Sequence, residues 1–263
     1  MAKSKKKEID IEKIVKSVKK STKNGKLNFK SALTLAVLFV FITVFALGYF
    51  GIIELPFLNE EPSYSLGSFS YEEIPEHSGE AYVILNDGIP YFNPDEYEAV
   101  GFEEYGELDD LGRCVYAFAC VGPETMPTED RGNIGSVKPS GWQSVEYDII
   151  DGGWLYNRCH LIGFKLTGEN ANERNLITGT RYLNISGMVK FENRVADYIK
   201  ETGNHVLYRV TPIFVGSELV ARGVVIEAYS MEDGGEEICF NIFCYNVQPG
   251  IIINYSDGTS VGP

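Results

Sequence analysis

The stretch that decides the fold of this chain reads Tyr156-Asn157-Arg158-Cys159-His160. It lies within residues 154–161, where aromatic and apolar side chains predict a β-strand that ends in polar residues. His160 is one of three histidines in the sequence. A histidine taken alone is more often a hydrogen-bonded structural residue than a catalyst, so the surrounding sequence has to decide its role.

Five other apolar stretches predict β-strands. They are residues 82–85, 114–120, 205–215, 219–230 and 238–247. The first of them leads into the turn Asn86-Asp87-Gly88 and is expected to form a hairpin with 90–92. Apolar positions after Gly187 recur at helical spacing until a stop signal at 202–204. The predicted fold is therefore α+β with a central antiparallel sheet.

A second polar segment follows the His160 strand, and it contains Asn175 and Asn184, nine residues apart, with Glu192 eight residues further on. With these residues the chain resembles the DNA/RNA non-specific endonuclease family, the ββα-metal-finger nucleases. The hallmark of that family is an Asp-Arg-Gly-His run followed by spaced asparagines, and residues 157–160 are similar to that run. The resemblance covers about residues 130–260 and implies a ββα-metal-finger active site.

The resemblance implies that His160 is the base that deprotonates a water molecule. An imidazole with an ordinary pKa of about 6.5 suits that role near neutral pH. It also implies that Asn184 binds one Mg²⁺ ion through its amide oxygen, which leaves the charge of the ion available to a phosphate. Mn²⁺ is the alternative ion, because it takes similar oxygen ligands. Glu192 is expected to hold a water of that ion.

Four further residues are expected to serve the same site. Arg158 either stabilises charge in the transition state or holds its loop by a salt bridge, and both roles stay open. Asn175 is grouped with the catalytic residues because its family counterpart lies at the active centre, and it is expected to bond backbone near His160. Arg181 and Lys138 are candidates for gripping a nucleic-acid backbone, with a solvated surface lysine as the simpler interpretation of Lys138.

Two positions depart from the pattern of the family. Asn157 stands where the family has aspartate, so a negative charge is missing while an acceptor oxygen is kept. Cys159 stands where the family has glycine, which implies that the backbone there has room for a Cβ and does not need a positive φ. Cys159 is not favoured as a nucleophile paired with His160, because neighbours in a strand point to opposite faces.

The formal net charge of −14 argues at first sight against a nucleic-acid partner, because lysine and arginine drive phosphate binding. The acidic residues are unevenly distributed, however. Residues 31–112 contain 16 acidic residues and no lysine or arginine, whereas 131–200 contain 9 basic and 7 acidic residues. The motif therefore lies in the locally basic stretch of the domain.

Residues 31–53 carry no charged side chain over 23 positions, enough helix to cross a hydrocarbon core of about 30 Å. No cleavage pattern of a signal peptide follows, so they are predicted to be a transmembrane helix that stays as an anchor. The 11 lysines of residues 1–30 place this basic tail in the cytoplasm. Residues 54–80 are expected to be an acidic linker, and 81–263 an extracytoplasmic nuclease domain at the cell membrane. The basic tail and single anchor are also similar to the membrane-anchored, DNA-entry type of these nucleases.

The chain has five cysteines, Cys114, Cys120, Cys159, Cys239 and Cys244. In an exported domain an odd number implies at least one thiol that is free or paired between chains. Their spacing does not resemble a zinc site, so mostly buried thiols are expected.

Three functions are compatible with these observations. The first is a metal-dependent endonuclease that cuts DNA, and RNA as well, with little sequence preference, because the expected contacts are to phosphate and metal. The alternative is a membrane-tethered nucleic-acid-binding module without turnover, and the third is an acidic surface-interaction domain with a coincidental motif. Nucleic acid and the lipid bilayer are the predicted partners, and no protein partner is predicted.

Overall fold

The structure is a computed structural model that describes residues 71–263. The predicted tail 1–30, the predicted anchor 31–53 and residues 54–70 of the predicted linker lie outside the described residues. Within 71–263, no helix is long and apolar enough to cross a membrane.

Six antiparallel strands form the central sheet, in the spatial order β1-β8-β7-β6-β3-β2. Their bounds are β1 Tyr82–Ile84, β2 Phe102–Tyr105, β3 Ala117–Val121, β6 Val206–Ile213, β7 Gly223–Ser230 and β8 Cys239–Tyr245. β6, β7 and β8 are nearly all buried, which explains why their sequences are almost continuously apolar. The predicted α+β class with an antiparallel sheet is confirmed.

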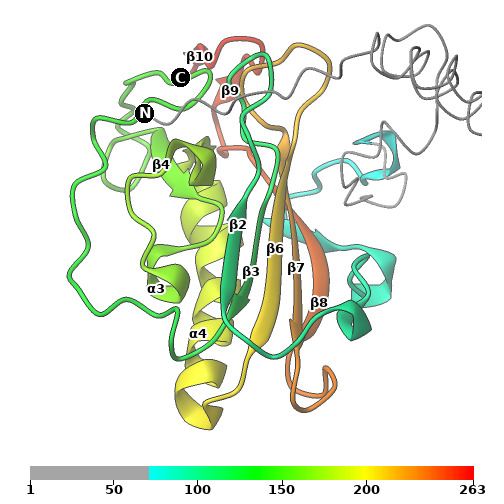
Figure 1. The fold of residues 1–263 in the computed structure, drawn as a ribbon. Coiled ribbons are helices and arrows are strands. Elements are labelled where there is room, and N and C mark those ends of the chain that lie inside the picture. Colours follow the sequence, from blue (N-terminus) through cyan, green and yellow to red (C-terminus); the bar gives the residue numbers. More distant parts are fainter. Residues whose placement is uncertain (1–70) are drawn as a thin grey trace, which may run out of the picture. The chain divides into compact units, whose positions relative to one another are not determined.

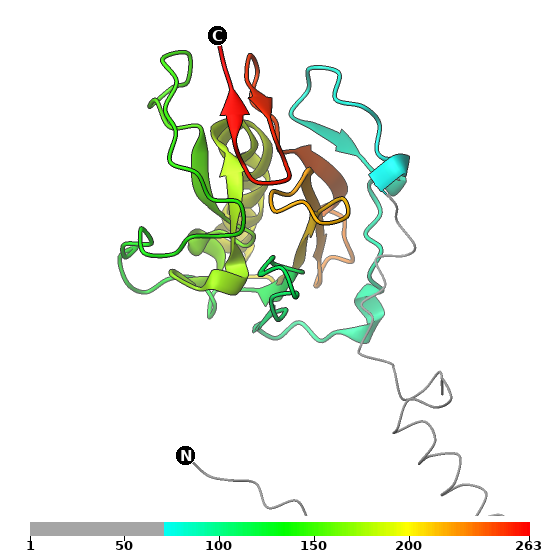
Figure 2. The ribbon, with the colours of Figure 1, turned by 90° about the horizontal axis from the view of Figure 1, so that it is seen from above.

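Helix α4 (Val189–Thr202) covers one face of this sheet (Figure 1). Its apolar side, with Val195 and Ile199, packs into one core with the sheet residues Tyr208 and Ile226. Alternate residues of a strand point to opposite faces, so the other face carries separate apolar clusters. The chain after β1 packs on that second face (Figure 2), where Phe92 and Tyr97 join a cluster with Phe118.

The second face shows that packed structure begins before residue 81. Tyr71 and Ile74, inside the segment expected to be a linker, belong to the cluster around Phe243. The Tyr71 and Phe243 ring centroids lie 6.5 Å apart in an edge-on contact. Burial of these side chains ties the start of the described chain to β8.

A separate two-stranded sheet, β4 (Tyr156–His160) with β5 (Leu176–Thr180), lies on the same side as α4. The chain between these strands forms the short helix α3 (Phe164–Thr167) and a 3₁₀ turn, η4 (Glu173–Asn175). After β5 a π-helix, η5 (Leu183–Met188), leads directly into α4. The order β4, β5, α4 is the expected ββα arrangement.

The smaller elements lie at the edges of the domain. They are η1 (Tyr71–Glu73), η2 (Asn86–Gly88), η3 (Pro94–Glu96), and the pair β9 (Ile252–Ile253) with β10 (Ser260–Val261).

The hairpin predicted over residues 82–92 is wrong, because β1 pairs with β8 instead. The chain after β1 turns through η2, where Asn86 and Asp87 take positive φ values of 47° and 52°. Pro90 has no N–H to give to a ladder, and the N–H of Tyr91 donates to the buried Glu227 carboxylate of β7 at 2.6 Å. Residues 90–92 therefore bond to a side chain of the sheet rather than to β1.

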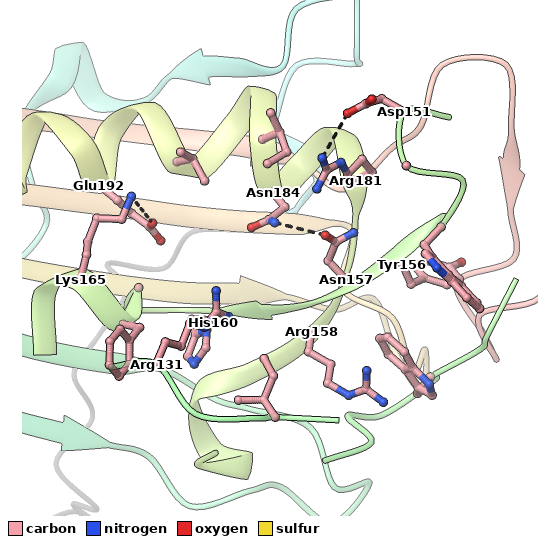
Figure 3. Close-up of a pocket in the computed structure, with 18 of the residues that line it drawn as sticks. Arg131, Asp151, Tyr156, Asn157, Arg158, His160, Lys165, Arg181, Asn184 and Glu192 are labelled. Carbon is pink, nitrogen blue, oxygen red and sulfur yellow. Dashed lines mark hydrogen bonds and ion pairs between the residues drawn. The ribbon is translucent and has the colours of Figure 1, made fainter. Parts of the chain in front are cut away.

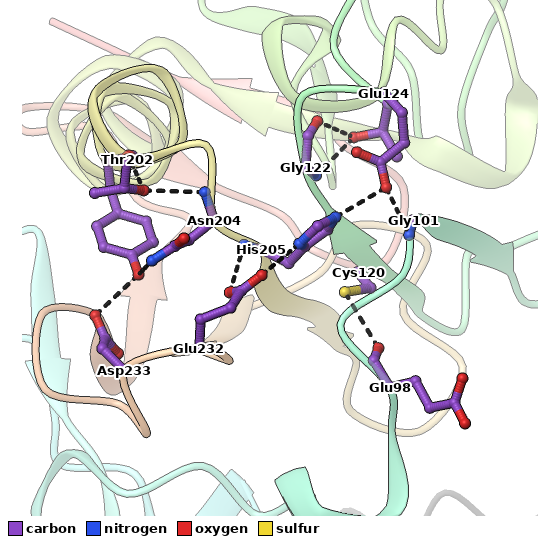
Figure 4. Close-up of polar contacts among 12 residues, drawn as sticks. Glu98, Gly101, Cys120, Gly122, Glu124, Thr202, Asn204, His205, Glu232 and Asp233 are labelled. Carbon is purple, nitrogen blue, oxygen red and sulfur yellow. Dashed lines mark hydrogen bonds and ion pairs between the residues drawn. The ribbon is translucent and has the colours of Figure 1, made fainter.

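His205, at the start of β6, is held between two carboxylates (Figure 4). Its Nδ1 lies 2.6 Å from Glu232 and its Nε2 lies 2.9 Å from Glu124. Carboxylates accept hydrogen bonds, so both ring nitrogens carry protons and the imidazole is charged. Glu124 also accepts from the N–H of Gly101 at 2.8 Å. This clasp joins the loop after β3, the loop before β2 and the turn after β7.

The interactions of His205 with Glu124 and Glu232 should make the free energy of unfolding depend on pH. Burial lowers the pKa of His205, but the hydrogen bonds from Glu232 and Glu124 outweigh burial and raise it overall. The pKa of Glu124 is lowered, first by its own backbone N–H and further by His205. The stabilisation by His205 is thus complete below its unfolded pKa of about 6.5 and is lost as the pH rises through the raised folded pKa. The stabilisation by Glu124 is lost at the acidic end, as the pH falls through its lowered pKa.

Urea unfolding of the protein and of His205→Gln between pH 5 and pH 9 measures this dependence. The stability difference between the two should be largest at pH 5 to 6 and should shrink as the pH rises through the folded pKa of His205. A difference that grows with rising pH would contradict the charged clasp.

Candidate active site

A pocket of about 850 Å³ lies along the edge of β4 that β5 leaves open. Tyr156, Asn157, Arg158 and His160 of β4 line it, while residues of η5 and α4 line it from one side and the loop around Arg131 from the other. Figure 3 shows the side chains of His160, Asn184 and Glu192 around one common space. We call this cavity the β4 pocket.

The structure brings together five of the seven predicted site residues. His160, Arg158, Arg181, Asn184 and Glu192 all line the β4 pocket. Asn175 is fully buried behind it. Lys138 is exposed and does not line the pocket, so the structure gives its proposed grip on a nucleic acid no support.

Two contacts define the protonation state of His160. Its Nε2 lies 2.8 Å from the backbone carbonyl of Asn170, and a carbonyl only accepts, so Nε2 carries the proton. Its Nδ1 lies 3.4 Å from Nη2 of Arg131, and a guanidinium only donates. Both neighbours require the same tautomer, with the proton at Nε2 and the lone pair of Nδ1 accepting from Arg131.

The surroundings of His160 also keep its ring neutral. Burial lowers the pKa of His160, the hydrogen bond to the Asn170 carbonyl opposes this, and the charge of Arg131 lowers the pKa further. The resulting pKa is below the ordinary value, so the ring is neutral at pH 7. A neutral imidazole whose Nδ1 carries no proton can act as a base.

Asn175 holds the backbone directly after His160. Its side-chain oxygen accepts from the N–H of Ile162 at 2.9 Å, and its amide nitrogen donates to the carbonyl of the same residue at 3.0 Å. The carbonyl of Asn175 also accepts from the N–H of Leu161 at 2.8 Å. The expectation that Asn175 bonds backbone near His160 is confirmed.

Cys159 fits the strand because its neighbour is small. It is 1% exposed and lies in the core shared with α4. A Cβ at Gly179 of β5 would come within 2.4 Å of the Cys159 sulfur, so glycine at 179 leaves the room that the thiol occupies. Burial raises the pKa of Cys159 well above its ordinary range, which makes it inert as a nucleophile. All five cysteines are free, and four of them are buried.

Asn157 uses its side-chain oxygen as an acceptor within the pocket. The amide nitrogen of Asn184 donates to the side-chain oxygen of Asn157 at 3.3 Å, as Figure 3 shows. That bond uses the nitrogen end of the Asn184 amide and leaves its oxygen for the pocket. The acceptor oxygen at 157 thus orients the amide at 184.

Glu192 is a buried carboxyl on the α4 side of the pocket. Burial raises its pKa to about 7, against the lowering effects of Lys165 and Arg131. The ammonium group of Lys165 lies 3.8 Å from this carboxylate. A Cβ at Gly163 would come within 2.6 Å of a Glu192 oxygen, so Gly163 makes the room for the carboxylate beside the strand.

The residues present fit a hard divalent cation. An amide oxygen at Asn184 and a carboxylate at Glu192 are the oxygen ligands that such cations prefer, with waters completing the shell. A carboxyl with so raised a pKa gains most from a nearby positive charge. Within 71–263 there is no group of three or more His, Cys, Asp and Glu side chains that could hold a metal.

Arg158 is fixed to the opposite wall of the pocket. Its Nε donates to the carbonyl of Val137 at 2.5 Å, and its Nη2 donates to that of Gly135 at 2.8 Å. Its guanidinium also lies over the ring of Trp142, 4.0 Å from the centroid. Arg158 therefore holds its loop, as one of its two expected roles required, but it does so through carbonyl groups rather than a salt bridge.

Arg131 and Lys165 are pocket residues that the sequence did not single out. Arg131 comes from a loop 29 residues before His160, and Lys165 lies on α3. The local excess of basic residues over 131–200 was the only signal for them. With Arg158 and Arg181 they make four basic residues in the pocket lining, against Asp151 and Glu192. The pocket is positive in a chain that is negative overall.

Arg181 has a weaker anchor than Arg158. It pairs with Asp151 at 3.1 Å, and the Asp151 side chain is 90% exposed. An exposed ion pair contributes little to stability, so Arg181 can exchange this partner for an anion in the pocket.

Comparison with known proteins assigns this arrangement to a family. A profile described as DNA/RNA non-specific endonuclease matches residues 95–232. A deoxyribonuclease from Streptococcus dysgalactiae subsp. equisimilis is 32% identical over 109 residues, which are 40% of this chain and 32% of that protein. The match thus spans about a third of the relative's length.

Solved structures share the fold. NucA from Streptococcus agalactiae, in a crystal structure with magnesium ion bound, gives a TM-score of 0.61 at 24% identity over 68% of this chain and 86% of that chain. The Sda1 nuclease with bound zinc ion gives 0.58 at 24% identity, over 70% of this chain and 97% of that chain.

The environment of His160 makes a direct prediction. Arg131→Gln removes the positive charge next to Nδ1, so the pKa of His160 should rise toward its ordinary value. An NMR titration of the imidazole in the full chain measures this, with Arg174→Gln, a surface arginine paired with Glu107, as the matched control. An unchanged or lowered pKa in Arg131→Gln would show that the guanidinium does not act on His160.

Proposed function

The chain belongs to the DNA/RNA non-specific endonuclease family, and we propose on that premise that it is a metal-dependent endonuclease that hydrolyses phosphodiester bonds of DNA and of RNA. The family places it among the phosphodiester hydrolases. The observation that carries the proposal is the geometry of His160, whose Nδ1 lone pair lies beside a guanidinium in a pocket shared with Asn184 and Glu192.

His160 acts as the general base in this proposal. Its Nδ1 takes the proton of the attacking water, and the Asn170 carbonyl bound to Nε2 stabilises the positive charge that the ring then carries. The Asn170 carbonyl and the hydrogen bonds from the Asn175 side chain to the backbone of Ile162 hold the ring in position before the proton moves. A base that is already neutral and oriented lowers the reorganisation needed during reaction.

Asn184 and Glu192 would hold the cation, Mg²⁺ or Mn²⁺, with Glu192 acting through a bound water. When bound, a divalent cation supplies positive charge that stabilises the phosphate and the leaving oxygen. Asn184 is neutral, so it does not cancel that charge. Asn157 keeps the Asn184 oxygen turned toward the pocket by accepting from its nitrogen.

In this proposal the phosphate is bound by two arginine side chains that are less firmly held than Arg158. Arg131 lies beside the base, and Arg181 is held by one exposed carboxylate. Both present donors in the planar fork that suits phosphate oxygens. Arg158 contributes charge from its fixed position on the wall. Such contacts carry no sequence information, which supports cleavage with little sequence preference.

We also propose that the enzyme is anchored in the cell membrane by residues 31–53, with residues 1–30 in the cytoplasm and the nuclease domain outside. The uncharged 23-residue stretch and the lysines before it support this. Protease added to intact cells should then remove the nuclease domain and leave an epitope tag at the N-terminus protected. Protection of the domain would contradict this orientation.

The activity has a direct test in the full chain purified in detergent. It should degrade plasmid DNA and RNA with Mg²⁺ and stop when EDTA is added. His160→Ala should lower the rate about 100- to 10,000-fold, the usual contribution of a general base. Asn184→Ala should raise the Mg²⁺ concentration needed for half-maximal rate.

His77→Ala is the matched control, since His77 lies outside the pocket against Tyr182 and Tyr245, and it should keep full activity. Undiminished cleavage by His160→Ala and Asn184→Ala would remove the proposed site. Binding without cleavage by the unaltered chain would favour the tethered binding module.

A further inference from the structure

Both tryptophans of this chain, Trp142 and Trp154, line the β4 pocket. Trp154 is 49% exposed. The proposed reaction gives it no part in binding water, cation or phosphate. A large aromatic side chain left half in water beside a reactive centre is a candidate contact for a ligand.

Trp154 has a defined place just before β4, the strand that carries the base. Its backbone is bridged to Glu146, and it precedes Tyr156, Arg158 and His160 at steps of two residues. At an extended rise of about 3.3 Å per residue, Trp154 is at most about 20 Å from His160 along the chain. One strand of B-DNA advances about 3.4 Å per nucleotide, so Trp154 lies within several nucleotides of a bond cleaved at His160.

The wall between these two residues is rigid and positive. Trp142 packs against the cluster that contains Leu155 and Tyr156, and the Arg158 guanidinium lies over its ring. The hydrogen bonds of Arg158 to loop carbonyls hold that pair in place. Such a wall suits the phosphates of a strand, and Trp154 is the exposed aromatic side chain of the same pocket.

We propose that Trp154 is a stacking platform for an unpaired base of the substrate, so that the enzyme prefers single-stranded nucleic acid to duplex. The inference rests on the proposed nuclease function and names the substrate class of the same site. Bases of a single strand offer their faces to an indole, whereas a base in a duplex must first be unstacked and unpaired. The basic lining and the shared pocket favour nucleic acid over a lipid surface as the occupant.

Intrinsic fluorescence tests the proposal, because the only two tryptophans of the chain line this pocket. The full chain carrying His160→Ala, kept in EDTA, is titrated with a single-stranded oligonucleotide, with its duplex and with an abasic strand of equal length. The single strand should quench the fluorescence and bind about 5- to 150-fold more tightly than the abasic strand, which corresponds to about 1–3 kcal/mol for one stacked base. Equal binding of the three ligands would overturn the proposal.

Substitutions then assign the effect to Trp154. With His160 intact, Trp154→Leu should raise KM for a single-stranded substrate more than for duplex and lower the single-strand preference, while Trp154→Phe should restore most of it. Ile149→Ala is the matched control, an exposed apolar residue outside the pocket lining, and it should change nothing.

An equal loss on both substrates, or no loss, would overturn the stacking role while leaving the nuclease function intact. Absence of cleavage of any substrate by the unaltered chain would instead refute the proposed function. Quenching of Trp154 by anionic phospholipid vesicles but not by oligonucleotides would assign the side chain to a membrane and overturn the proposal.

Discussion

The hydrogen bond between Nε2 of His160 and the carbonyl of Asn170 is the constraint on which the site depends. It fixes the proton at one ring nitrogen and so decides that the other nitrogen faces the pocket as an acceptor. The bond has this effect only because both ends are held. His160 closes the β4–β5 ladder, and the Asn175 amide clamps the chain immediately after it. The two-stranded sheet thus delivers an oriented base, while the larger sheet supports α4 on the other side of the pocket.

Charge distribution in the pocket follows from which side chains are already engaged. Arg158 is bound to carbonyl groups and a tryptophan ring, so it shapes the wall. Arg131 stands beside the base and depresses its pKa. Glu192 is buried next to Lys165 with a raised pKa, which fits a carboxyl whose partner is a cation. The pocket can therefore attract an anion although the chain as a whole is acidic, because the excess of acidic residues lies mainly outside residues 131–200.

Sequence patterns predicted the parts of the fold with strong periodicity. Strands β6, β7 and β8 are mostly buried and helix α4 buries one side, and their apolar positions repeat accordingly. His160, Asn184 and Glu192 could be placed in one site because their spacing matches a known family. Arg131 could not, because it lies in an irregular loop whose path is set by tertiary contacts. The 82–92 hairpin failed for a related reason: β1 finds its partner in β8, more than 150 residues away, and local turn chemistry contains no information about that strand.

The most direct test of this account is the ¹⁵N spectrum of the His160 imidazole in the full chain at pH 7, assigned by its loss in His160→Gln. The account predicts a neutral ring with a protonated Nε2 and an unprotonated Nδ1. A ring protonated at Nδ1, or one that carries both protons at that pH, would contradict it, because no lone pair would then face the pocket.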